Sequence, residues 1–192
     1  MNDNWYEAVD GDVRLTQGDI ILDCPLLRWK DVSSPLTKED PDTLKRALDV
    51  IRADVVVMTQ ACDLENEKVK DIVLCPHVSI TKHQETWETE MRKRTEKSLS
   101  KFWQRYCDDI CKGVIFNLSI LNSGDTGTLT TDHRIVDFSE IFTIPRSFLE
   151  SLLKERNQPR LRLLPPYREH LSQAFARFFM RVGLPTDISK VW

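Results

Sequence analysis

The residues best suited to chemistry stand where two apolar runs end, VVVMTQACDLEN (residues 55–66) and VKDIVLCPHV (residues 69–78). The polar turn between the runs favours an antiparallel hairpin, which could bring Cys62 near His77. A cysteine nucleophile needs such an imidazole to lower its pKa, whereas Asp63 would raise the thiol pKa if it lay close. We therefore expect a structural corner, with Cys62 packed and Asp63 bound to turn amides, and keep catalysis as the alternative.

Sulfur and imidazole groups that could bind a metal ion are present, but their spacing is poor. Structural zinc sites usually use paired ligands at short, knuckle-like spacings, which are missing from the four candidates Cys24, Cys62, Cys75 and His77. Cys107 and Cys111 share a helix face and would need ligands from elsewhere. We expect no metal, no cofactor and reduced thiols, because five cysteines show no repeating spacing.

Cations gather toward the end of the chain. The whole chain has a net charge of −3, yet from Pro145 onward nine Lys/Arg face four Asp/Glu. Alternation places Arg160 and Arg162 on one side of a strand, and the helix that follows carries Arg177 and Arg181. Such a basic face is a first clue to a partner protein and is also compatible with nucleic acid.

Tryptophan is the second feature that favours a protein partner. Trp5 and Trp192 stand near the two ends of the sequence, where packing in a core does not readily explain them. Tryptophan and arginine are the residues most enriched at interface hot spots. We expect partner binding through Trp5, Trp192 and the four arginines of the basic face.

These side chains must be positioned by several short strands. A strand is expected at residues 19–24 and ends at Pro25, with a second short strand in LRWKDV and a loop in SSPLTKEDPD. Further strands are expected within residues 44–60, 69–78, 114–121 and 133–144.

Helical periodicity marks three other regions. Residues 81–112 have no Pro or Gly, and a buried stripe of Leu99, Phe102, Trp103, Tyr106 and Ile110 predicts a helical insertion. Pro145 opens a short helix. A long amphipathic helix follows in YREHLSQAFARFFMRVG, ended by Gly183 and Pro185.

Strands linked mainly by turns, with helices inserted and appended, favour an α+β fold with a small antiparallel SH3-like β-barrel. We expect one domain, residues 1–192, with the helical insertion at about residues 81–112. The acidic beginning of the sequence does not resemble a secretion signal, and no apolar run is long enough to cross a bilayer. The expected location is the cytoplasm.

The order of GDIILDCPLL, VVVMTQACDLEN and VKDIVLCPHV resembles a poorly characterised group of bacterial and phage-related proteins. Its shared mark is a strand ending in Ser/Thr-Gln-x-Cys-Asp, matched here by Thr59, Gln60, Cys62 and Asp63. At greater distance, the chain is similar to the SH3-like barrels of the PemK/MazF toxin ribonucleases. That resemblance implies Arg28 and Thr59 as catalytic residues.

Together these observations favour a non-enzymatic accessory module that binds a partner protein through its termini and basic C-terminal face. A place in a prokaryotic antiviral defence system, of CRISPR or toxin-like type, suits this profile. The alternatives are an endoribonuclease that uses Arg28 with Thr59, or Cys62 with His77, and a protein that binds nucleic acid without cleaving it.

Overall fold

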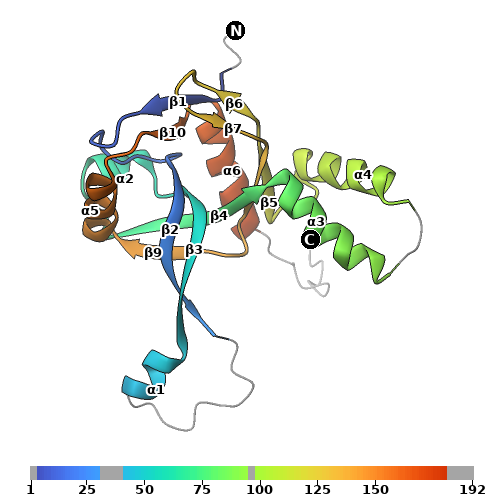
Figure 1. Ribbon diagram of the computed structural model, residues 1–192. Helices are drawn as coiled ribbons and strands as arrows, with labels where there is room; N and C mark the ends of the chain where they lie inside the picture. Colours follow the sequence, from blue (N-terminus) through green and yellow to red (C-terminus); the bar gives the residue numbers. More distant parts are fainter. Residues whose placement is uncertain (1–3, 31–40, 95–97, 181–192) are drawn as a thin grey trace, which may run out of the picture.

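The computed structural model describes residues 4–30, 41–94 and 98–180 (Figure 1). Figure 1 shows the strands gathered in one body, from which the β2–β3 hairpin projects with α1 at its end, while α3 and α4 lie to one side. In chain order the elements are β1 Tyr6–Val9, β2 Ile20–Trp29, α1 Pro41–Arg46, β3 Leu48–Val57, α2 Ala61–Glu65, β4 Asp71–Ser79, α3 Ile80–Arg92, α4 Ser100–Cys111, β5 Leu118–Leu121, β6 Gly124–Asp125, β7 Thr130–Thr131, β8 Arg134–Asp137, β9 Phe142–Pro145, α5 Arg146–Arg156, β10 Arg160–Leu163 and α6 Tyr167–Phe179.

The strands pair in antiparallel fashion. The main sheet has the order β2-β3-β4-β8-β5, and β9 also pairs with β4, while β1 pairs with β10. The register Val56↔Cys75 confirms the hairpin predicted between residues 55 and 78. The α+β class is therefore confirmed. Within the described ranges no sheet closes into a barrel, so the predicted SH3-like barrel is not confirmed.

The run Val55–Val56–Val57 lies between β2 and β4 in the main sheet and is fully buried. Val56 packs in a cluster that includes Leu171 of α6, while Val55 and Val57 pack in another that includes Leu149 of α5. Alternate residues of a strand point to opposite faces, so both faces of β3 are covered here. This two-sided burial explains why the segment is continuously apolar instead of alternating.

The strand β2 continues through Pro25 to Trp29, so the prediction that Pro25 ends the strand was wrong. Proline has no N–H to donate to a ladder, but it is tolerated on edge strands, and β2 is the edge of the main sheet. A register shift between Ile21 and Cys24, with Asp23 at φ 50°, forms a bulge just before the proline.

The helical insertion is confirmed as two helices, α3 and α4. Trp103 and Tyr106 of α4 pack against Trp87 of α3, with ring centroids 5.3 and 5.4 Å from the Trp87 ring. Ile110 is buried against Leu118 of β5 and joins the insertion to the main sheet. Phe102, predicted to be buried, is exposed on the outer side of α4.

The long C-terminal helix is confirmed over α6. Leu171 is buried in the core, and Ala174, Phe175 and Phe178 pack against the same cluster, as the apolar stripe predicts. Phe179 is exposed instead, and the predicted helix end at Gly183 and Pro185 lies outside the described residues. None of the helices in the described ranges is both long and apolar enough to cross a membrane.

Candidate functional site

Arg28 and Thr59, the pair implied by the ribonuclease resemblance, lie far apart. Arg28 is exposed on the projecting hairpin, opposite Asp49. Thr59 follows β3 ten residues after Asp49, which corresponds to a separation on the order of 30 Å along the chain. Thr59 is buried, and its Oγ1 accepts a hydrogen bond from the Val73 N–H over 2.7 Å. The two side chains therefore do not form one site.

Cys62 and His77 are also separated. The β3–β4 pairing runs from Val57↔Leu74 to Val55↔Pro76, so that Cys62 lies beyond one end of it and His77 beyond the other. Cys62 is exposed, and its nearest polar contacts are Oε1 of Gln60 at 3.7 Å and a carboxylate oxygen of Asp63 at 3.9 Å. The exposure corrects the expectation of a packed cysteine, and within the described ranges no imidazole contacts the thiol.

Cys24 and Cys75 are buried in different clusters, on the two faces of the main sheet. They cannot converge with Cys62 on one metal ion. In the part of the chain that the structure describes, no three His, Cys, Asp or Glu side chains come together as a metal site.

His77 belongs instead to a buried polar cluster. Its Nδ1 accepts a hydrogen bond from Nε of Arg134 over 3.1 Å, and Arg134 forms ion pairs with Asp54 and Asp132. Burial first, and then the Arg134 guanidinium, lower the pKa of His77 from 6.5 to about 4. A histidine that is 3% exposed and neutral is poorly placed for acid–base catalysis, so the cluster holds β3, β4 and β8 together.

This cluster borders a cleft of about 540 Å³ that runs between β2, the loop before β8 and the segment that joins α5 to β10. Three arginines line the cleft, Arg134, Arg156 and Arg160, and all of them form hydrogen bonds within the protein. Arg134 uses its nitrogens on His77, Asp54 and Asp132, and Arg156 donates to the carbonyls of Leu22 and Asp23 over 2.7 and 2.6 Å. The cleft therefore offers no unused cation for an anionic substrate.

Arg160 and Arg162, predicted to bind a partner, both bind the side chain of Asp19. The Asp19 carboxylate is fully buried and accepts from Nε of Arg160 over 2.8 Å and from Nε of Arg162 over 2.5 Å. Arg160 is only 5% exposed and also donates to backbone carbonyls of residues 10, 13 and 14. These arginines fasten the N-terminal segment to β10, which leaves Arg160 no surface for a partner.

The remaining residues predicted to bind a partner differ in their burial and in whether the structure describes them. Trp5 is half-buried and stacks on Tyr167, with ring centroids 4.1 Å apart. Arg177 is exposed on α6. Arg181 and Trp192 lie outside the described residues.

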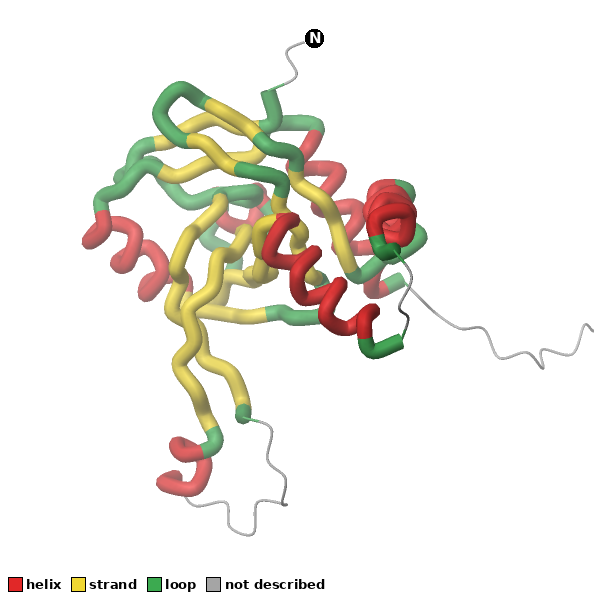
Figure 2. Tube along the Cα trace, turned by 45° about the vertical axis from the view of Figure 1, so that its right-hand side comes forward, coloured by secondary structure: helices red, strands yellow, loops and turns green. Residues whose placement is uncertain are grey.

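The feature that sequence reasoning missed is the projecting hairpin, which we name the arm: residues 24–30 of β2 and its end, and residues 41–53 with α1 (Figure 2). β3 pairs with β4 only from Val55 to Val57, so the arm is a two-stranded ribbon over its outer length. Leu27 pairs with Val50, and Trp29 pairs with Leu48. Cross-strand partners share a face, so Leu27, Trp29 and Val50 lie on one side of the arm, its outer face.

The outer face is apolar and open to solvent. Leu27, Trp29 and Val50 are 64%, 62% and 73% exposed, whereas the neighbouring Leu26, on the other side, is 3% exposed and packs in the core. The arm as a whole is basic, with five Lys/Arg and two Asp/Glu within the described residues, although alternation places Arg28 and Lys30 on the side opposite the outer face. The signal in the sequence was LLRWK. Its apolar residues fall on both faces of an edge strand, so one of the two apolar faces can be left exposed.

Comparison of the chain with protein-family models, curated proteins and solved structures found no match. Function must therefore follow from the geometry. An exposed apolar face of this kind can bind the surface of another macromolecule.

Proposed function

We propose that this protein is a non-enzymatic accessory module that binds an acidic partner protein through the outer face of the arm. The observation that carries the proposal is the exposure of Leu27, Trp29 and Val50 on one side of a two-stranded ribbon. Among the described residues no third strand or helix covers the outer face, and a partner that covers this apolar face would stabilise a two-stranded ribbon, which is marginally stable by itself in water. A central tryptophan is a frequent hot spot of such contacts.

Charge favours an acidic partner. The described residues of the arm include five Lys/Arg and two Asp/Glu, whereas the whole sequence has a net charge of −3. Some of this charge is internally paired, as Lys30 with Asp49 at 3.7 Å and Arg52 with Asp23 at 2.6 Å. A β-ribbon can also enter a nucleic-acid groove. The apolar centre of the outer face supports a protein partner, because protein interfaces place apolar residues centrally and charges at the rim.

The resemblances seen in the sequence suggest the biological system in which this module acts. A cytoplasmic accessory protein of a prokaryotic defence system fits a binding module that lacks a catalytic arrangement at Arg28 and Thr59 or at Cys62 and His77. The successive antiparallel pairing of β2, β3 and β4, with β9 returning to β4, supports a distant relation to SH3-like barrels of the PemK/MazF type.

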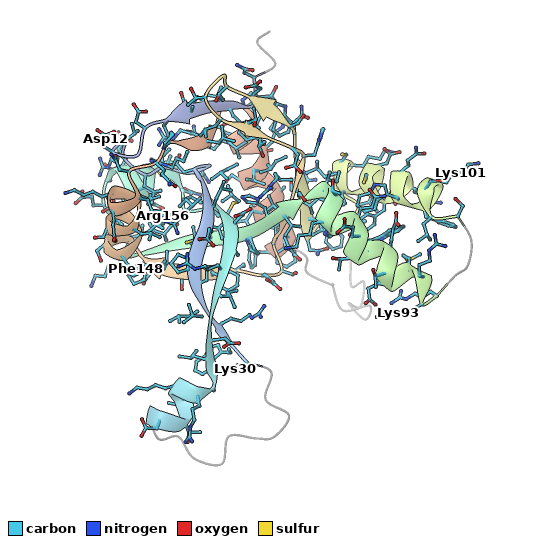
Figure 3. All side chains as sticks on the ribbon, viewed as in Figure 1. Asp12, Lys30, Lys93, Lys101, Phe148 and Arg156 are labelled. Atoms are coloured by element: carbon cyan, nitrogen blue, oxygen red, sulfur yellow. The ribbon has the colours of Figure 1, made fainter. Side chains whose placement is uncertain are left out.

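The test compares Trp29→Ser with Phe148→Ser, since Phe148 is a large exposed side chain on the body, away from the arm (Figure 3). Proteins that copurify with the tagged wild-type chain in its host cells are identified, and a candidate is purified and titrated against each variant. Loss of a tryptophan hot spot costs about 2 kcal/mol, which is about a 30-fold increase in Kd. The Phe148→Ser variant should bind as the wild type does.

Several results would contradict the proposal. One is that no copurified protein depends on Trp29, and another is that Phe148→Ser weakens binding as much as Trp29→Ser. Sedimentation that shows a dimer abolished by Trp29→Ser would identify the partner as a second copy. Cleavage of RNA by the purified protein, lost in Arg28→Ala or Cys62→Ala, would establish an enzyme instead.

A further inference from the structure

A second surface, remote from the arm in the sheet order, has backbone groups available for binding. β5 is the last strand of the main sheet, and β8 is the only described strand that pairs with it. The Phe138 N–H donates to the Asn117 carbonyl over 2.8 Å, so Asn117 and the alternate residues Ser119 and Leu121 bond toward β8. In an antiparallel ladder the intervening residues face the other way. The backbone of Ile120 is therefore directed to the open edge.

The neighbouring carbonyl on that edge confirms this direction. Asn122, two residues after Ile120, accepts a hydrogen bond from the Tyr6 hydroxyl over 2.7 Å. Its carbonyl is thus turned away from β8 and is already satisfied. The open part of the edge ends at Asn122.

The edge lies in a groove of about 500 Å³ between two helices. Leu121 packs in the cluster that contains Leu171 of α6, whereas Leu118 packs with Ile110 of α4. The two helices therefore stand on opposite faces of β5. A strand placed beside β5 would lie between α6 and the end of α4. We name this space the edge groove.

The length of the edge groove suits a short extended segment. Its α6 wall runs from Tyr167 to Arg177, which corresponds to about 15 Å along a helix. Four or five residues of extended chain span about the same distance. Tyr167, stacked on Trp5, marks one end, and Arg177, which approaches Gly113 at the end of α4, marks the other.

The charged residues that line the edge groove favour an acidic peptide over a basic one. Of the residues that the structure describes, Lys112, His170 and Arg177 line the edge groove, and none of the lining residues is Asp or Glu. The chain as a whole carries more acidic than basic residues, 30 against 27, so the charge of this lining differs from that of the whole chain. Neither Lys112 nor Arg177 forms an ion pair with a carboxylate of the described residues. Their charges are available to a ligand.

We infer that the edge groove binds an extended acidic peptide of four or five residues, which adds to β5 as a further strand. The backbone of Ile120 supplies ladder hydrogen bonds, as in other cases of strand addition, and the cations select acidic side chains. The site uses no residue of the arm. With both surfaces occupied, the module would join two partners.

The test uses two fluorescein-labelled hexapeptides, one alternating Glu with Val and the other Lys with Val, titrated with the full chain by anisotropy. The acidic peptide should bind and the basic peptide should not. Arg177→Glu and Lys112→Glu should each raise the Kd of the acidic peptide at least about tenfold. Lys101→Glu is the matched control, because Lys101 is exposed at the opposite end of α4 (Figure 3).

A third peptide tests the binding mode. The acidic hexapeptide with N-methyl groups on alternate amides retains its charge but cannot form the ladder, so it should not bind. Equal binding of this peptide, equal binding of the basic peptide, or no binding of the acidic peptide up to about 1 mM would overturn the inference. Trp29→Ser should leave peptide binding unchanged, so failure of the arm proposal and failure of this one are separate results.

Discussion

Nε of Arg134 donates a hydrogen bond to Nδ1 of His77 over 3.1 Å, inside a sheet that leaves His77 only 3% exposed. The acceptor role of Nδ1 places the ring proton of neutral His77 on Nε2. Protonation at Nδ1 would break this bond and put a buried cation beside a guanidinium. The histidine therefore connects the pH of the solution to the stability of the sheet.

We expect the free energy of unfolding to fall as the pH drops from about 6.5 to about 4. The pKa of His77 is about 4 in the folded chain and about 6.5 when unfolded, so the unfolded chain binds the extra proton in this window. Stability is complete above the window and decreases by about 3 kcal/mol across it. Urea unfolding at several pH values measures the change. Because carboxylates titrate nearby, the reference is His77→Gln, whose curve should be flatter; parallel curves would show that His77 does not contribute.

Asp19→Asn should destabilise the protein by about 3 to 5 kcal/mol, because it leaves the Arg160 and Arg162 cations without their buried counterion. Urea unfolding provides the measurement. Asp49→Asn, which removes an exposed ion pair with Lys30, should change stability by less than about 1 kcal/mol. Similar losses of unfolding free energy in the two variants would mean that the Asp19 ion pairs do not hold the N-terminal segment on β10.

The neighbouring leucines of β2 should behave in opposite ways. Leu26→Ala removes a buried side chain from the core and should cost about 2 to 4 kcal/mol. Leu27→Ala removes an exposed side chain and should change stability by about 0.5 kcal/mol or less. Equilibrium unfolding distinguishes the two. A large loss from Leu27→Ala would show that the outer face of the arm is covered in the free protein.

Thiol labelling should separate the cysteines into two groups. Cys62 and Cys111 are exposed and should react with N-ethylmaleimide in the native protein at neutral pH. Cys24 and Cys75 are fully buried, and burial raises their pKa values to about 11 and about 12. They should be labelled only after unfolding, as followed by peptide mass spectrometry. Labelling of Cys75 as fast as Cys62 would contradict the buried position of β4.

Local pattern was sufficient for much of the fold. The apolar stripe within residues 167–183 predicted α6, the run of valines predicted the last part of β3, and the change in composition predicted the insertion that contains α3 and α4. Each of these signals depends on residues within a few turns or one strand of each other. The prediction that Pro25 ends the strand was wrong because a proline is tolerated in an edge strand. Whether a strand lies at an edge is decided by its pairing with segments distant in the sequence.

The candidate sites depended on contacts that no local pattern contains. Arg160 looked like a surface cation, but its partner Asp19 is 141 residues away in the chain. Leu26 and Leu27 are chemically identical, and only the packing of the body against one side of the arm makes one core and the other exposed. By itself the sequence determined the element types and the alternation of faces, because these follow from backbone periodicity. Tertiary structure alone decided which face is covered and which charge is neutralised, since burial and pairing require segments distant in sequence to meet.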